Sequence, residues 1–345
     1  MFDSAGVASV VAATPATKER LLIICLPDPS FLLASNGLTV SGKGKCLIDE
    51  SDVVPLATVG QPRVYGAKMK TELIITTYNS IRALELCLVS VAGQSLLPDM
   101  ICIADDGSGP ETKSFIESLS ATYPNLEFRH VWHPDNGFEK CAILNNAIES
   151  SDADFLFFLD GDVMIHPVFL KRHFDLAQRG RFSTGSLIRL DTPTTEAMTA
   201  EKITSGQVFD RGWLREAGAI DRLGTWLKTM PFPFALQNVL DVITPVQKAL
   251  CGANWSAFRD DILKVNGFDE TLKYGGLDKE FGIRLINAGV KGRHLRYTAP
   301  LVHLDHPRGY RDPEKVKRHK AMIKDVRTSG RSWTEHGIIK GPKPA

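Results

Sequence analysis

Two aspartates, one residue apart, close an apolar run in the middle of the chain. Asp160, Gly161 and Asp162 follow residues 155–159, a run typical of a buried strand. Carboxylates at a strand end that turns can face one hard cation, and Mg²⁺ or Mn²⁺ prefers such oxygen ligands while sharing its shell with substrate phosphates. An acidic turn without a metal is the plain alternative. Because three strand–helix units precede this motif, we expect a cation site.

Polar side chains also follow two earlier apolar runs. Thr76 and Tyr78 come at the end of residues 72–77, and Tyr78 can stack on a base or stand as a turn aromatic. Asp105 and Asp106 end residues 100–106; they can bond a nucleobase or ribose hydroxyls, or cap the next helix. Lys140 opens a helical segment and can reach a phosphate or point into solvent.

Two candidates for proton transfer and metal binding lie near the end of the chain. In residues 274–285, YGGLDKEFGIRL, Asp278 follows a glycine pair and is the candidate general base. Glu280 fits the simpler role of an acid in the first turn of a helix. In residues 301–312, His303 or His306 is the candidate third protein ligand of the cation, against the alternative of a structural histidine.

The candidate site residues can act together only if the strands before them end at the same edge of one sheet. Apolar runs at 72–77, 100–108, 126–133 and 154–162 alternate with helical patterns at 80–94, 111–123 and 136–151. Alternating strands and helices predict an α/β fold with right-handed crossovers and a parallel sheet covered on both faces. Ligands of such sheets bind beyond the carboxyl ends of the strands.

Composition excludes several classes of protein. The 345 residues are 43% hydrophobic and 23% charged, which excludes collagen, wholesale disorder and a disulfide mini-protein. No apolar stretch approaches the roughly 18 residues of a membrane-spanning helix. Six cysteines without a CxxC pair, and the absence of a convincing signal peptide, predict a reducing compartment, so we expect a cytoplasmic protein.

The charge is uneven although the net charge is only +1. Residues 291–345 carry 14 Lys and Arg against five Asp and Glu. Such a segment can meet a phosphate-rich partner or the inner face of an anionic membrane, or be a solvated basic helix. Residues 1–68 alternate short apolar runs with Gly, Pro and Ser and predict no chemistry.

Residues 72 to about 310 resemble the GT-A glycosyltransferases of family 2. The resemblance rests on IITTYNS, IADDGS, NGFEKCAILNNAI, FLFFLDGD and the block CGANWSAF…NGFDE…GGLDKEFGIRLINAG, in that order. The last block, through HLDHPR, also resembles β-1,4-galactosyltransferases and chondroitin-polymerase-type enzymes. The resemblance implies a GT-A fold, mostly parallel and Rossmann-like, with an N-terminal extension and a helical basic tail.

The resemblance also implies roles for individual residues. A nucleotide-sugar donor is expected at six positions: Thr76, Tyr78, Asp106, Lys140, Asp160 and Tyr274. The expected metal ligands are Asp162 and His306, with Asp160 and His303 as further candidates for Mn²⁺ or Mg²⁺. Asp278 corresponds to the catalytic base. The acceptor is expected at Gly252, Asn254 and Glu280. Leu277 stands where the family often has Glu, and Tyr274 where galactosyltransferases usually have Trp.

The resulting hypothesis is an inverting, metal-dependent glycosyltransferase. It would move galactose or an N-acetylhexosamine from a UDP-sugar to a hydroxyl of a glycan or lipid-linked acceptor, in surface polysaccharide synthesis and without nucleic acid. The alternatives are a haloacid-dehalogenase-type phosphatase, a non-catalytic nucleotide or glycan binder of the same fold, and a sugar nucleotidyltransferase. The expected parts are an extension (1–68), a donor half (69–165), a connector with the acceptor and catalytic half (166–306) and a basic helical tail (307–345).

Overall fold

A computed structural model of the chain describes residues 10–12, 22–24, 69–244, 250–306 and 313–344. The chain divides into two units, Met1–Gln61 and Pro62–Ala345. In the first unit, β1 (Val10–Ala12) pairs antiparallel with β2 (Leu22–Ile24). The rest of the predicted extension 1–68 lies outside the described residues.

The described part of the second unit is built on a seven-stranded sheet with the order β11-β8-β10-β6-β3-β4-β5. Its strands are β3 (Thr71–Thr77), β4 (Met100–Asp105), β5 (Phe128–Trp132), β6 (Phe155–Asp160), β8 (Arg181–Gly185), β10 (Asn254–Phe258) and β11 (Lys291–Leu295). Strands β5, β4, β3 and β6 are parallel, which confirms the predicted repeat. Because β10 is antiparallel to both β6 and β8, and β11 is parallel to β8, six strands end at the same edge.

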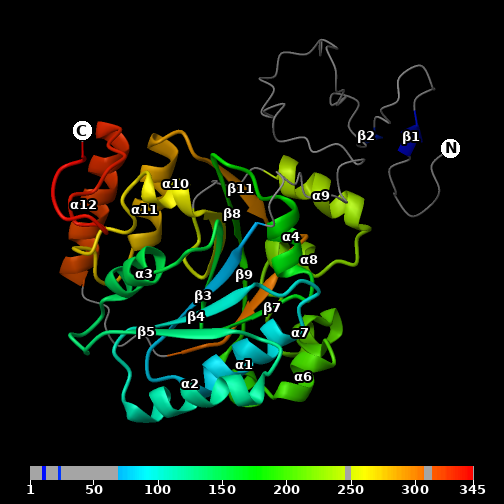
Figure 1. The fold of residues 1–345 in the computed structure, drawn as a ribbon. Helices are drawn as coiled ribbons and strands as arrows, with labels where there is room; N and C mark the ends of the chain where they lie inside the picture. The colour runs from blue at the N-terminus through cyan, green and yellow to red at the C-terminus, as the bar shows by residue number, and fades with distance from the viewer. Residues whose placement is uncertain (1–9, 13–21, 25–68, 245–249, 307–312, 345) are drawn as a thin grey trace. The chain divides into compact units, whose positions relative to one another are not determined.

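Helices cover both faces of this sheet (Figure 1). Side chains alternate along a strand, so Leu73 and Ile75 belong to the core under α1 (Ile81–Ala92), α2 (Pro110–Thr122) and α4 (Phe169–Asp175). Ile74 belongs to the opposite core, under α3 (Lys140–Glu149), α10 (Arg259–Leu263) and α11 (Leu277–Asn287). Apolar burial on both faces accounts for the unbroken apolar runs of these strands.

A second, three-stranded sheet brings a late segment of the chain next to the residues that follow β6. It has the order β7-β12-β9, made of β7 (Val163–Ile165), β12 (Leu301–His303) and β9 (Leu187–Arg189). Between β9 and β10 lie α5 (Thr192–Glu196), α6 (Ala200–Thr204), the 3₁₀ helix η3 (Gln207–Phe209), α7 (Arg211–Glu216), α8 (Leu223–Lys228) and α9 (Phe234–Ile243). These short helices agree with the irregular, proline-interrupted pattern of the sequence.

The basic tail contains one long helix, as the fold prediction expects. Helix α12 spans Pro313–Ser329, and the residues after it turn back to the loop before α11. There Glu270 N–H donates to His336 O (3.0 Å) and Ile338 N–H donates to Asn266 O (3.1 Å). The tail is therefore part of the folded unit.

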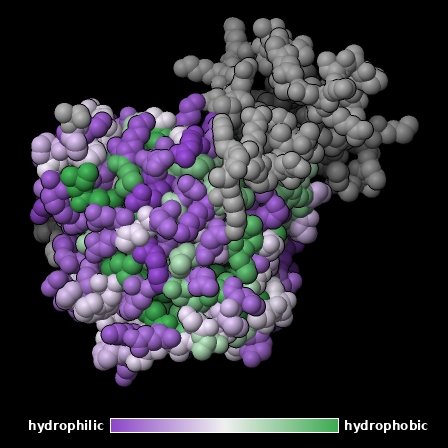
Figure 2. Space-filling model, in the orientation of Figure 1, coloured by the Kyte–Doolittle hydropathy of each residue, from purple (hydrophilic) through white to green (hydrophobic). Residues whose placement is uncertain are grey.

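The face shown in Figure 2 is mainly hydrophilic, and its hydrophobic side chains form small separate groups. In the ranges that the structure describes, no helix combines the length and the apolar character needed to cross a bilayer.

Candidate active site

The site lies at the topological switch point of the sheet, where the order in which the chain adds strands reverses. The chain adds β4 and β5 on one side of β3 and then returns to place β6 on the other side. At this switch point Thr76 lies opposite Asp160, and Thr76 Oγ1 donates to Asp160 Oδ1 (3.2 Å). Gly161 allows the close turn, because a Cβ there would lie 2.6 Å from Thr76 O. Open α/β sheets bind their ligands at such points.

Lys140 points into this position rather than into solvent. Its ammonium contacts Asp160 Oδ1 from the start of α3. Burial acts to lower the pKa of Lys140, but the charges of Asp160, Asp162 and Asp278 outweigh it and raise the pKa above its ordinary value. All three carboxylates therefore lie close enough to act on one ammonium group.

Asp105 and Asp106 are both buried but have different partners. Asp105 accepts from the Ser108 N–H (2.8 Å) and faces His130 Nε2 (3.1 Å). Burial acts to raise the pKa of Asp105, and the hydrogen bonds from His130 and Ser108 outweigh it, leaving the pKa below its usual value. Asp105 thus holds the turn after β4, but it does not cap α2, whose N-cap is Gly109 without a side-chain bond.

Asp106 lies one residue nearer the rim of the sheet. Its two oxygens contact His133 Nε2 (2.9 Å) and the Glu139 N–H (3.1 Å), and burial raises the pKa of its carboxyl. Tyr78, 42% exposed, donates to Asp135 Oδ2 (2.9 Å). The partners His133 and Asp135 were not predicted, because nothing in their spacing from the strands marks them.

Asp162, His303 and His306 form a group that could hold a metal ion. Their ligand atoms lie within 4.8 Å of one another, with Asp162 Oδ2 3.2 Å from His306 Nε2 and 3.7 Å from His303 Nε2. Strand β12 positions the histidines, because it pairs with β7 and sets His303 opposite Val163. The sequence left open whether His303 or His306 faces Asp162. In the structure both histidines do.

The donor set of this group fits a divalent cation. Asp162 Oδ1 is buried and has no hydrogen-bond partner among the described residues, and burial raises the pKa of its carboxyl. A buried carboxylate oxygen without a partner is costly unless a ligand completes it. Asp160 does not belong to this group, and its Oδ1 contacts Lys140 and Thr76.

Asp278 stands at the start of α11, directly after the loop of the two glycines. Gly275 and Gly276 both have φ of +92°, a conformation that favours glycine. The Gly252 N–H donates to Asp278 Oδ2 (3.2 Å). A Cβ on Gly252 would lie 3.2 Å from Asp278 Cβ. The glycine at 252 therefore allows the two segments to meet, and its contact with an acceptor stays a prediction.

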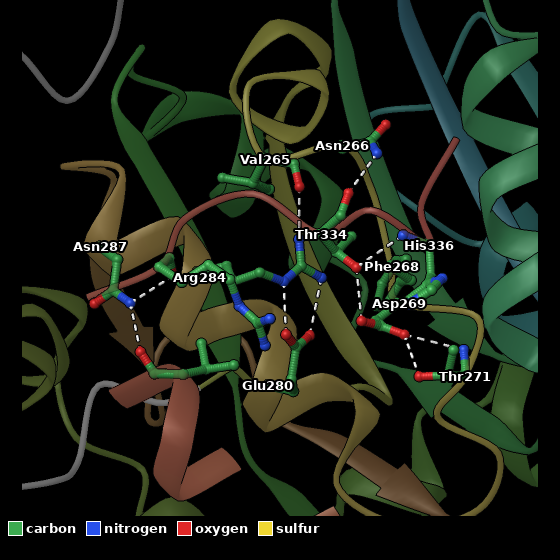
Figure 3. Close-up of polar contacts among 12 residues, drawn as sticks. Val265, Asn266, Phe268, Asp269, Thr271, Glu280, Arg284, Asn287, Thr334 and His336 are labelled. Carbon is green, nitrogen blue, oxygen red and sulfur yellow. Dashed lines mark hydrogen bonds and ion pairs between the residues drawn. The ribbon is translucent and has the colours of Figure 1, made fainter. Parts of the chain in front are cut away.

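Two of the acceptor assignments are corrected by burial. Glu280 is 1% exposed and forms a two-pronged ion pair with Arg284, at 2.7 and 2.9 Å (Figure 3). Asn254 is fully buried at the start of β10, where its Oδ1 lies 2.4 Å from a Cβ built on Gly185. Both side chains are therefore buried in this structure, Glu280 against Arg284 and Asn254 with an Oδ1 that has no hydrogen-bond partner among the described residues. Glu280 does lie in the first turn of α11, as the simpler alternative for this residue predicts.

Tyr274 packs edge-on against the Phe138 ring, with ring centroids 5.6 Å apart, and comes directly before the two glycines in the sequence. A narrow recess of about 10 Å³, lined mainly by apolar side chains, lies between the ends of β3 and β6 and the start of α11. Its lining is Thr76, Lys140, Leu144, Phe158, Leu159, Asp160, Gly252, Trp255, Phe268 and Leu277.

Helix α12 adds contacts to the glycine loop that sequence reasoning missed. His319 is 3% exposed, and its Nδ1 lies 2.9 Å from Gly275 O. A Cβ on Gly276 would lie 2.7 Å from Ile323 Cδ1. The only available signal was the predicted helix in the tail, since no pattern told where it packs.

Comparisons with known proteins agree with this geometry. Residues 72–239 match the family described as glycosyl transferase family 2, and residues 244–307 match the N-terminal domain of galactosyltransferase. The chain is 25% identical over 314 residues to the uncharacterized glycosyltransferase YfnE of Bacillus subtilis (strain 168), covering 80% of this chain and 75% of that protein.

Two further proteins extend the comparison. Chondroitin synthase of Escherichia coli is 24% identical over 233 residues, covering 63% of this chain and 32% of the synthase, so the match spans about a third of that relative. The solved structure of GalNAc-T7 has a TM-score of 0.50 at 12% identity, covering 76% of this chain and 48% of that one, which shows a shared fold. The chain therefore carries a glycosyltransferase family 2 domain of the GT-A fold, continued by a galactosyltransferase-type segment, and is a glycosyltransferase.

Proposed function

We propose that this glycosyltransferase is inverting and metal-dependent, and that it moves a galactose or N-acetylhexosamine residue from a UDP-sugar to an acceptor hydroxyl in the synthesis of a surface glycan. One observation carries the proposal. The group Asp162–His303–His306, the switch-point pair Thr76–Asp160 and the candidate base Asp278 meet at one edge of the sheet. Those are the parts that a metal-assisted transfer between two bound substrates needs.

The donor half is proposed to hold the nucleotide over the ends of β3, β4 and β6. Tyr78 offers an exposed ring for stacking, while Asp106 and Asp160 offer carboxylates for the base and the ribose. Tyr274 borders the sugar. The choice of UDP is in keeping with GalNAc-T7, whose structure contains UDP, GalNAc and Mn²⁺.

Asp162, His303 and His306 are the residues proposed to hold Mn²⁺ or Mg²⁺. When bound, the ion would supply positive charge beside the leaving diphosphate. Lys140 adds a fixed ammonium group on the same side. Because these groups are held by protein contacts before the substrate arrives, they would stabilise the developing charge without reorganising.

Asp278 is proposed to take the proton of the acceptor hydroxyl as its oxygen attacks the anomeric carbon. The C–O bond to the nucleoside diphosphate breaks on the opposite face, so the configuration inverts and no covalent enzyme intermediate forms. The Gly252 N–H fixes the orientation of the Asp278 carboxylate through Oδ2. A general base so placed contributes roughly 10²–10⁴ in rate.

A UDP-release assay without acceptor tests the proposal. The chain is incubated with a panel of UDP-sugars and with Mn²⁺, Mg²⁺ or EDTA. We expect slow hydrolysis of one donor in the presence of metal and none in EDTA. Binding of UDP that is unaffected by metal, with no release from any donor, would contradict the proposal.

A further inference from the structure

A polar cluster lies at the same edge of the sheet as the active site but beyond β10. We call Ser186, Lys228, His294 and Arg296 the edge cluster. Strands β8 and β11 pair in parallel, with His294 opposite Thr184 and Leu295 opposite Gly185, so Ser186 and Arg296 follow the ends of the two strands. Since β8 runs in the direction of β6, these ends lie at the edge that carries Asp160.

The cluster also lies on the same face of the sheet as Asp278. Thr184 is two residues from Phe182, which belongs to the core under α11, so Thr184 and its partner His294 point to that face. Thr184 Oγ1 accepts from the Cys251 N–H (2.9 Å), one residue before the Gly252 that binds Asp278. The cluster is thus next to the acceptor side of the site and separated by β10 from the donor strands.

Three polar atoms of the edge cluster are buried and lack a partner. Ser186 Oγ, His294 Nδ1 and Arg296 Nε have no hydrogen bond within the described part of the chain. Almost every buried polar atom of a native protein finds a partner. Three such atoms on two adjacent strand ends are therefore available to a polar ligand.

The charges beside the cluster are mainly positive. The buried carboxylate of Asp241 lies next to Arg296, but its oxygens accept from the Arg296 and Tyr297 N–H groups (2.6 and 2.8 Å) and from Thr298 Oγ1. Lys228 is 9% exposed, and its Nζ donates to Leu187 O (2.9 Å). Burial, then the charges of Arg296 and Arg222, lower the pKa of Lys228 to about 8. Asp221 opposes this effect but is itself bonded to Thr225 Oγ1 (3.0 Å) and lies 3.6 Å from Arg222 Nε.

His294 shows the same excess of positive charge. Burial, then the charges of Arg296 and Lys228, lower the pKa of His294 to about 4. Its ring is therefore neutral near pH 7 and can donate or accept a hydrogen bond. Cations that repel one another in a buried position need an anion to offset them.

We propose that the edge cluster binds an oxyanion carried by the acceptor, either the carboxylate of an acidic sugar or a phosphoryl group. A guanidinium and an ammonium group beside a hydroxyl and a neutral imidazole suit such an anion, because bonds between ionised partners are the strong ones. The inference rests on the proposed transfer reaction and adds that the acceptor is acidic. The donor diphosphate is assigned to the other side of β10, beside Asp162.

Inorganic phosphate is the first probe. Melting temperatures are measured with phosphate and with chloride at equal ionic strength, in Mg²⁺ and saturating UDP, so that the donor site is filled. We expect phosphate at a hundredfold excess over its dissociation constant to raise the melting temperature of the wild type by about 5 °C. Lys228→Met and Arg296→Met should lose this shift, and Lys228→Arg should keep it.

Lys264→Met is the matched control. Lys264 Nζ also donates to a main-chain oxygen, Ala288 O (2.8 Å), but Lys264 is exposed and stands away from the edge. The control should keep the phosphate shift. An equal shift in the wild type and in both Met variants would overturn the proposal.

Three sugars that differ only at C6 then distinguish the sources of the anion. D-glucose, D-glucuronate and D-glucose 6-phosphate are compared by ligand-observed NMR in the presence of UDP. We expect at least one of the two anions to bind about tenfold more tightly than glucose, a preference that both Met variants lose. The preferred anion identifies a carboxylate or a phosphoryl group.

Two results would overturn the assignment. Equal binding of all three sugars would show that the cluster does not select an anion. A loss of UDP affinity in Lys228→Met or Arg296→Met would move the cluster to the donor diphosphate. Failure of the proposed function itself shows separately, as an absence of UDP-sugar hydrolysis in the wild type.

Discussion

Three aspartates of the candidate site differ in what holds them, and this difference supports the roles proposed for them. Asp160 is bonded to Lys140 and Thr76, Asp162 faces two histidines, and the Gly252 N–H holds Asp278. A carboxylate beside an ammonium group is neutralised, whereas one beside histidines can share a cation with them. Asp278 is thus the carboxylate best placed to take a proton.

Asp278→Asn should remove transfer while leaving the donor bound. The amide keeps the size and the hydrogen bond from Gly252 but cannot accept a proton, so we expect kcat to fall by about 10²–10⁴. Transfer is measured as UDP release with the identified donor and acceptor, and UDP affinity by calorimetry. Asp260→Asn, at an exposed carboxylate paired with Arg179, is the control. A rate near that of the wild type would refute the assignment of the base.

Metal binding can be measured apart from activity. If Asp162, His303 and His306 hold the ion, Mn²⁺ should raise the melting temperature of the wild type but not that of Asp162→Ala. Asp305→Ala is the matched control, because Asp305 lies between the histidines in sequence and its side chain accepts from Thr192 Oγ1 (2.6 Å). A Mn²⁺ shift that survives in Asp162→Ala would place the ion elsewhere.

At the scale of single elements, α11 is fixed by a buried ion pair. Arg284 is fully buried, donates to Glu280 through two nitrogens, and donates to Val265 O (2.6 Å) through the third (Figure 3). The ion pair lies within α11, and the bond to Val265 O joins this helix to the segment that follows α10. The two buried charges of α11 are tolerated because Glu280 and Arg284 neutralise each other and are hydrogen-bonded.

Glu280→Ala should destabilise the fold by about 3–5 kcal/mol, because it leaves the Arg284 charge buried and unpaired. The free energy of unfolding is measured by urea denaturation. Lys113→Ala breaks the exposed pair of Lys113 with Glu117 on α2 and should cost less than about 1 kcal/mol. Similar costs for the two variants would contradict the structural role of the pair.

A buried histidine couples α4 to β10 and makes stability depend on pH. His173 Nδ1 lies 2.8 Å from Ser256 Oγ. Burial, then the charge of Arg172, lower the pKa of His173 to about 3. Below pH 6.5 the unfolded chain therefore binds a proton that the folded chain does not, and stability falls as pH falls.

The expected loss is about 1.4 kcal/mol per pH unit between pH 6.5 and 3, or about 2 kcal/mol at pH 5. Urea denaturation at several pH values measures it. His173→Gln removes the titrating group, and its pH slope should be smaller by that amount. An unchanged slope in the variant would show that another group titrates.

At the scale of the whole folded unit, the end of the chain closes the structure around Asn266. This residue is 1% exposed with φ of +66°. Its Nδ2 donates to Thr334 O and Ile339 O (both 2.7 Å), and its Oδ1 accepts from the Ile339 N–H (2.8 Å). Thr334 in turn donates to Asp269 Oδ2 (2.6 Å; Figure 3), so the tail holds the loop before α11.

Asn266→Ala should destabilise the unit by about 3–5 kcal/mol, from three lost hydrogen bonds and a left-handed φ that Ala tolerates poorly. Asn266→Gly keeps the φ at no cost and loses only the bonds, so we expect about 1 kcal/mol less damage. Melting temperature and urea denaturation measure both. Wild-type stability in Asn266→Ala would show that the tail does not hold the loop.

Much of the fold and part of the site could be predicted from the sequence. The four parallel strands and their helices follow from apolar periodicity, and Asp160, Asp162 and Asp278 follow from their places beside strand ends and glycines. Glu280 and Asn254 could not be separated from site residues, because burial depends on what packs over them. The partners His133 and Asp135 carry no pattern of their own.

The sequence by itself determined the α/β class, the order of the motifs and the edge of the sheet where they gather, because period-2 and period-3.6 patterns are local. Only the tertiary structure decided which side chains meet. Pairing of β12 with β7 brings two histidines to Asp162, Asp160 is taken by Lys140, and Ser186 and Arg296 join through the pairing of β8 with β11. Those contacts join residues up to about 140 positions apart, and no local pattern encodes such a distance.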